Sequence, residues 1–182
     1  MGPYLIKKIE LEGLLSKIGK VLDLGSGQGT DALYFAKQGY EVDAVDRDIT
    51  ALKELQSSNL DIKLNPIEST IEGFQFTANA YSLIIASNSL PFLSSKEEVK
   101  RILTESAGAL TDGGILYVSL FGTKDEWNGN KEGMTFFEES EAQELISSLS
   151  LERYYQILEE GYGRTKAGGI KYWSIFKFLL KK

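Results

Sequence analysis

The sequence predicts an α/β protein with a doubly wound, mostly parallel sheet that ends in one antiparallel hairpin. An apolar run from Val21 to Leu24 precedes a glycine-rich turn and then a helical pattern, which is how an α/β sheet presents a nucleotide site. Strand and helix patterns alternate from there on. The last two β-rich runs have no helix between them, so we expect them to pair antiparallel.

The expected elements follow from apolar periodicity and from glycine and capping signals. The expected strands are residues 21–24, 41–45, 61–67, 83–86, 115–121, 154–158 and 172–180. The expected helices are residues 32–39, 49–56, 95–112 and 140–149, with a further helical segment in residues 1–20. Ser95 and Glu98 form a capping box, and Gly113-Gly114 is expected to end the helix that it opens, with Leu110 facing inward. Four glycines in residues 159–171 predict a long hairpin loop.

Length and composition describe one domain, residues 1–182, in which residues 1–20 cover one end of the sheet. With a formal net charge of −6, the chain lacks the basic face that nucleic-acid binding requires. No apolar stretch approaches the ~20 residues of a membrane span. The start of the chain lacks the apolar region of a signal peptide, so we expect a cytoplasmic protein. No exposed apolar stripe stands out, which leaves monomer and homodimer open.

Neither cysteine nor histidine occurs in the chain. The absence of cysteine excludes disulfides, thiolate nucleophiles and thiolate metal sites. The absence of histidine removes the commonest metal ligand and the usual general base near neutral pH. Zinc enzymes, histidine-based hydrolases and cysteine proteases are therefore excluded, and we expect no bound metal.

The glycine-rich turn contains Gly25, Gly27 and Gly29, spaced every second residue. Glycine lets the backbone approach a ligand at φ and ψ values that a Cβ would penalise. A dinucleotide-binding turn would have its third glycine at position 30, where this chain has Thr30. A nicotinamide dehydrogenase would also give no role to Asp23, which lies two residues before the first glycine.

The stretch Val21-Leu-Asp-Leu-Gly-Ser-Gly-Gln-Gly29 resembles the first signature of class I S-adenosylmethionine-dependent methyltransferases. Residues 22–46 are similar to the tellurite-resistance (TehB-like) and thiopurine methyltransferase branches. The resemblance implies a Rossmann-like seven-stranded sheet, with residues 1–20 covering the cofactor cleft. It also implies that the loop packs its backbone against the methionine part of the cofactor, with contacts from Asp23, Gly25, Ser26, Gly27 and Gly29.

An acid at the end of the second expected strand supports a nucleotide ligand. Asp46 lies seventeen residues after Gly29, and a carboxylate there can accept both ribose hydroxyls. Arg47 follows it in the same expected site. The alternative is that Asp46 only caps the turn into the next helix. Asp43 points to the other face of the strand and is a poorer candidate.

The adenine contacts are expected in the loop after the third strand. The resemblance favours Ile71 and Glu72, which would contact the adenine ring and its amino group. Glu68-Ser69 is an open alternative, and so is a solvated acidic loop with one buried isoleucine. Ile49 is expected to form the other wall of the adenine slot.

The corner after the fourth strand reads Ser87-Asn-Ser-Leu-Pro-Phe92. Amino-group methyltransferases carry Asn-Pro-Pro-Tyr or a near variant here, and this chain departs from that pattern at Ser89 and Leu90. Methylation of nucleobase or glutamine amino groups is therefore not favoured. We expect Ser87 and Asn88 to line the methionine end and the methyl-transfer cleft. Alternatively, Asn88 is a turn residue before Pro91.

The segment 121–137 follows the fifth strand and is too long and glycine-rich for a simple connection. Its charged and aromatic residues suit a substrate lid, although a surface loop with one packed tryptophan fits equally well. If a general base is needed, Glu126 or Asp125 in this segment is the candidate.

These features together predict an enzyme that transfers a methyl group from S-adenosylmethionine to a small-molecule acceptor and releases S-adenosylhomocysteine. A sulfonium methyl is already activated, so in-line displacement needs a positioned nucleophile and the exclusion of water. Thiol, selenide, tellurite-derived or amine acceptors fit a chain without histidine. The alternative is a non-catalytic module of the same fold that binds the cofactor as a scaffold.

Overall fold

The computed structural model describes residues 13, 19–165 and 167–182. The expected helical segment in residues 1–20, and its place over the cofactor cleft, therefore lie outside the described residues, apart from 13, 19 and 20. In chain order the described elements are β1 (Lys20–Leu24), α2 (Thr30–Lys37), β2 (Glu41–Asp46), α3 (Thr50–Ser58), β3 (Leu64–Glu68), β4 (Tyr81–Ala86), η1 (Leu90–Phe92), α4 (Lys96–Ala109), β5 (Leu110–Gly122), β6 (Phe136–Phe137), α5 (Glu139–Ser147), β7 (Glu152–Arg164) and β8 (Ile170–Lys181).

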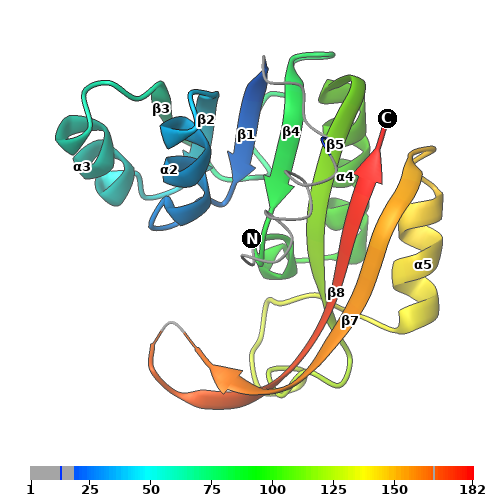
Figure 1. Ribbon diagram of the computed structural model, residues 1–182. Helices are drawn as coiled ribbons and strands as arrows, with labels where there is room; N and C mark the ends of the chain where they lie inside the picture. Colours follow the sequence, from blue (N-terminus) through cyan, green and yellow to red (C-terminus); the bar gives the residue numbers. More distant parts are fainter. Residues whose placement is uncertain (1–12, 14–18, 166) are drawn as a thin grey trace.

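One sheet in the order β3-β2-β1-β4-β5-β8-β7 forms the centre of the molecule (Figure 1). The first five strands of this path pair in parallel. β8 runs antiparallel to both β5 and β7, as the missing helix between the last two runs predicts. The two-residue strand β6, which the sequence pattern did not indicate, adds an eighth strand beside β5.

Two apolar layers cover the faces of the sheet. Buried residues of α4 and α5 pack on one face with the side chains of β4, β5 and β8. Buried residues of α2 and α3 pack on the other face, mainly with β2, β4 and β5. The order of strands reverses between β1 and β4, so the turns that leave these strands diverge at the carboxyl edge. This is where an open α/β sheet binds its ligand. Among the described residues, no helix is long and apolar enough to cross a membrane.

The structure corrects the expected end of the third long helix. α4 begins at the Ser95 cap, whose hydroxyl accepts from the Glu98 N–H at 3.1 Å, but it ends at Ala109 rather than at Gly113-Gly114. Leu110 already pairs with Tyr81 in the sheet, and the pairing with β4 resumes only at Ile115. The two glycines therefore belong to an irregularity at the start of β5.

The final hairpin also differs from expectation. β7 and β8 stay paired as far as Arg164 and Ile170, so the loop is short and two of the four glycines lie within β7. A Cβ at Gly163 would lie only 3.0 Å from the indole of Trp173, so glycine leaves room for this ring. In the sequence, such a glycine has the same appearance as a loop signal.

Candidate functional site

The glycine turn after β1 is attached by its backbone to the end of β2. The N–H groups of Gly25 and Ser26 donate to the Val45 carbonyl at 2.8 and 3.0 Å. The Gly27 N–H donates to the Asp46 carboxylate at 2.7 Å. All three glycines have positive φ, between 54° and 71°, which a side chain would strain. The turn therefore has one defined shape at the carboxyl edge.

Gly25 also makes room for two of its neighbours. A Cβ at Gly25 would lie 2.5 Å from the Ser89 Cβ and 3.2 Å from Ile71 Cδ1. The structure thus brings the turn after β1, the loop after β3 and the corner after β4 together at one point. Gly29 has a different role, because a Cβ there would meet Leu52 and Leu55 of α3 at 2.7 Å.

Two buried side-chain oxygens at this edge have no hydrogen-bond partner, and they are the only such atoms among the described residues. They are Asp23 Oδ2 and Ser89 Oγ, in residues that are 3% and 7% exposed. Burial raises the pKa of Asp23 to about 7. The charge of Asp31 adds to this rise, and a hydrogen bond from the Ala32 N–H opposes it. Buried polar atoms are nearly always paired, so both oxygens are available to a ligand.

The two acids of β2 have different surroundings. Asp43 is buried and accepts from the Tyr81 hydroxyl at 2.8 Å, and it also contacts Lys20 and Asn65. Asp46 is half-buried and accepts only backbone N–H groups in the described contacts, those of Gly27 and Asp48. Each of its carboxylate oxygens keeps a second lone pair for a ligand. Arg47 beside it is exposed.

Both candidate adenine contacts lie at this edge. Ile71 is half-buried against Gly25, whereas the Glu72 side chain is exposed and its carbonyl accepts from Arg101 at 3.0 Å. The alternative residue Ser69 donates its N–H to the Asp46 carbonyl at 3.1 Å. Ile49 is 7% exposed and belongs to the core, which leaves it little surface for an adenine ring.

The corner after β4 is held by the neighbouring strand β5. Asn88 has a φ of 55° and donates its N–H to Ser119 Oγ at 2.6 Å. Ser119 Oγ in turn donates to the Asn88 side-chain oxygen at 3.2 Å. The buried Tyr117 lies near Ser87 and Ser119, and burial raises the pKa of its hydroxyl. The bonds between Asn88 and Ser119 therefore join the ends of β4 and β5, with Ser87 beside them.

The expected base candidates have other partners. Asp125 is 2% exposed, forms an ion pair with Lys171 and accepts the N–H groups of Trp127 and Ser174. Glu126 accepts the Tyr172 N–H at 2.7 Å. These contacts favour a role in holding the segment after β5 rather than the expected role as a general base.

The structure adds Ser89, to which the sequence pattern gave no contact. Its signal is positional, because it lies just past the carboxyl end of β4 between the exposed Asn88 and the buried Leu90.

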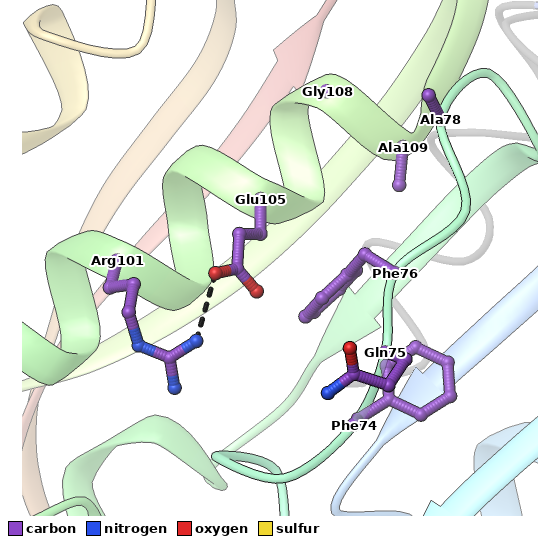
Figure 2. Close-up of a pocket in the computed structure, with 8 residues that line it drawn as sticks. All are labelled: Phe74, Gln75, Phe76, Ala78, Arg101, Glu105, Gly108 and Ala109. Carbon is purple, nitrogen blue, oxygen red and sulfur yellow. Dashed lines mark hydrogen bonds and ion pairs between the residues drawn. The ribbon is translucent and has the colours of Figure 1, made fainter.

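A separate cavity of about 310 Å³ lies between α4 and residues 74–78, lined among others by Phe74, Phe76, Arg101 and Glu105 (Figure 2). None of the predicted site residues lines it.

Comparisons with known proteins identify the family and the fold. A family model described as a methyltransferase domain matches residues 21–114, which is just over half of the chain. No curated protein sequence matches it.

Three solved structures share the fold. A methyltransferase dependent on S-adenosylmethionine (SAM) from Methanosarcina mazei has a TM-score of 0.76 and 19% identity, over 100% of this chain and 98% of that one. TehB from Haemophilus influenzae has a TM-score of 0.77 and 18% identity, over 100% of this chain and 62% of that one. A 1,6-didemethyltoxoflavin-N1-methyltransferase from Burkholderia thailandensis, crystallised with its substrate and S-adenosylhomocysteine, has a TM-score of 0.68 and 16% identity, over 99% and 76%.

At these identities the structural likeness shows the fold alone, so the TehB-like or thiopurine branch stays a prediction. The family match covers the glycine turn, both acids of β2 and the corner after β4. The expected class I fold is confirmed. The chain belongs to the methyltransferase domain family, and its fold is that of methyltransferases that depend on S-adenosylmethionine.

Proposed function

We propose that the protein transfers a methyl group from S-adenosylmethionine to a small molecule at the carboxyl edge of β1, β2 and β4. The observation that carries this proposal is the pair of unpartnered buried oxygens, Asp23 Oδ2 and Ser89 Oγ, beside a glycine whose Cβ would clash. The Burkholderia enzyme, named for methylation of a small heterocycle, supports a small acceptor.

Each predicted residue has a part in this proposal. The backbone of Gly25, Ser26, Gly27 and Gly29 shapes the loop, and Asp23 and Ser89 contact the amino-acid end of the cofactor. Asp46 accepts the ribose hydroxyls, with Arg47 beside it. Ile71 packs on the adenine ring, with Glu72 near its amino group. Ser87 and Asn88 line the side from which the acceptor approaches.

The chemistry asks for positioning more than for proton transfer. When bound, S-adenosylmethionine supplies an activated methyl group for in-line displacement. The chain's own residues hold the reactants in line and exclude water. Because Asp125 and Glu126 already have partners, we propose that neither of these two carboxylates removes a proton from the acceptor.

Calorimetric titration of the full chain tests the cofactor assignment. We expect binding of S-adenosylmethionine and S-adenosylhomocysteine and no binding of NAD. Asp46→Asn removes a charged acceptor, and a hydrogen bond to a charged group is worth roughly 1.5–3 kcal/mol, so S-adenosylhomocysteine should bind about tenfold to a hundredfold more weakly. Asp48→Asn is the matched control, because Asp48 is exposed and should leave the affinity unchanged. Binding of NAD alone would overturn the proposal.

A product screen tests turnover. Labelled S-adenosylmethionine is incubated with the protein and a cell extract, and the molecule that gains the label is identified. A labelled small molecule supports the proposed reaction. Tight cofactor binding with no transfer to the extract, or to a panel of thiols, amines and carboxylates, would favour the scaffold instead.

We also propose that the protein acts in the cytoplasm as a monomer or homodimer, without nucleic-acid or membrane partners. The net charge of −6 supports the absence of a nucleic-acid partner. Sedimentation at several concentrations distinguishes the two oligomeric states.

A further inference from the structure

Two segments outside the matched family residues meet beyond the carboxyl ends of β1 and β4. One is the lid segment, residues 123–135, and the other is the far end of the β7–β8 hairpin; both extend below the sheet in Figure 1. Glu126 and Tyr172 connect them by a backbone hydrogen bond of 3.0 Å and a side-chain bond of 2.7 Å. The lid segment also reaches the corner after β4, because Thr135 donates to the carbonyls of Pro91 and Leu93 at 2.8 and 2.6 Å.

The strongest connection is a buried ion pair inside an aromatic cluster. Lys171 Nζ pairs with Asp125 and lies 3.8, 4.3 and 5.4 Å from the ring centroids of Trp173, Trp127 and Phe121. Both charged residues are nearly inaccessible, at 3% and 2% exposed. A well-packed apolar pair usually stabilises a fold at least as well as a buried ion pair. The contribution of this pair is therefore better explained by the positions that it imposes on the rings around it.

That geometry concerns the ring of Trp127. The Asp125 carboxylate accepts the backbone N–H of Trp127 at 3.0 Å, and the ammonium groups of Lys171 and Lys131 lie near the indole. The indole is partly buried and contacts the ring of Phe92, with centroids 6.4 Å apart and planes at 61°. Two aromatic rings from separate loops are thus held next to each other.

Phe92 is exposed where its neighbours are not. Leu90, Pro91 and Leu93 are buried, but Phe92 is 54% exposed. It comes three residues after Ser89, which lies against Gly25 of the cofactor turn. The exposed ring of Phe92 therefore lies three residues along the chain from Ser89, a proposed cofactor contact.

We propose that Phe92 and Trp127 form the wall that binds a flat heteroaromatic acceptor, and that Asp125 and Lys171 are positioning residues for this wall. The inference rests on the proposed function. A fixed wall reduces the ordering cost of binding, and aromatic rings prefer aromatic partners. The acids of the lid segment next to the wall, Asp125 and Glu126, have partners already, so an acceptor atom that needs no proton removed, such as an unprotonated ring nitrogen, suits this wall.

The test compares two uncharged probes, 1-naphthalenemethanol and its fully saturated counterpart, on the full chain saturated with S-adenosylhomocysteine. Binding is followed by calorimetry. We expect the flat probe to bind about three- to tenfold more tightly. Phe92→Leu should abolish this preference and leave the affinity for S-adenosylhomocysteine unchanged. Tyr154→Leu, which removes a ring that is 38% exposed near the start of β7, should keep the preference.

The outcomes distinguish the two proposals. Failure of the wild type to bind S-adenosylhomocysteine overturns the proposed function. Normal binding of S-adenosylhomocysteine with equal affinity for both probes, or an equal loss of preference in both variants, overturns the wall.

Fluorescence tests the positioning residues separately. Trp127 and Trp173 are the two tryptophans of the chain, and both flank Lys171, so the emission reports on this cluster. Lys171→Met should shift the emission to the red and remove the probe preference, whereas Lys171→Arg should retain both. A folded Lys171→Met protein with unchanged emission and preference shows that the pair does not position the wall.

Discussion

The turn after β1 and the lid segment after β5 lie at the same edge of the sheet but are built in different ways. Backbone groups build the turn, through the N–H groups of Gly25, Ser26 and Gly27 on the end of β2. The lid segment has backbone bonds too, but its buried attachment is formed by the side chains of Asp125 and Lys171, which are 46 positions apart in the chain. A site formed by backbone groups suits a ligand that all members of a family bind. Side chains, in contrast, can differ between members that act on different acceptors.

The largest effect is expected at Lys171, where side chains attach the lid segment. Lys171→Met leaves the Asp125 carboxylate buried without its cation, which should lower the free energy of unfolding by about 3–5 kcal/mol. Lys177→Met is the control, because its partner Glu159 is 56% exposed and exposed pairs contribute about 0–1 kcal/mol. Urea unfolding measures both variants. Equal losses in the two variants would contradict the contrast between buried and exposed pairs.

The next largest effect is expected at Gly25, in the turn after β1 that backbone groups hold. Gly25→Ala meets Ser89 at 2.5 Å and keeps a φ of 71°, so it should cost about 2–3 kcal/mol and weaken S-adenosylhomocysteine binding at least tenfold. Gly39→Ala has a φ of 91° but nothing within 4 Å. It should cost only about 1–2 kcal/mol and leave the affinity unchanged. Loss of affinity in Gly39→Ala as well would show that the clash at Gly25 is not the cause.

A smaller effect per pH unit is expected from Asp23. Because burial raises the pKa of Asp23 to about 7, the folded chain keeps a proton that the unfolded chain releases near pH 4. The stability of the cofactor-free protein should therefore fall as the pH rises from about 4 to about 7, by at most about 1.4 kcal/mol per pH unit from this group. Asp23→Asn should remove this part of the slope, and the exposed Asp61→Asn should not. Urea unfolding across the pH range gives the slopes; a wild-type slope retained in Asp23→Asn would contradict the assignment.

The smallest effect separates the two acids of β2. Tyr81→Phe removes the hydroxyl that donates to Asp43 and should cost about 1 kcal/mol of stability. S-adenosylhomocysteine affinity should not change, in contrast to Asp46→Asn. A weaker affinity in Tyr81→Phe would mean that Asp43 influences the cofactor site.

Local patterns were sufficient for most of the fold. Val21 to Leu24, the glycine spacing and the Ser95 cap each depend on neighbours within a few residues, and each lies where the sequence indicates. Two of the differences involve glycines, beside the short strand β6, which no pattern indicates. The sequence predicts a helix end at Gly113-Gly114 and a loop at Gly163, because a glycine pattern does not say whether a turn, a bulge or a neighbouring ring requires it.

The roles proposed for the site residues divide in the same way. Asp23, the glycine turn and Asp46 were found from the sequence because the chain order of strand, turn and helix places them at one edge. Only the tertiary structure brings Ser89 and Ile71 against Gly25 and pairs Asp125 with Lys171. The physical reason is that backbone conformation is encoded over a few adjacent residues, whereas the partner of a buried side chain depends on which distant segments the folded sheet brings together.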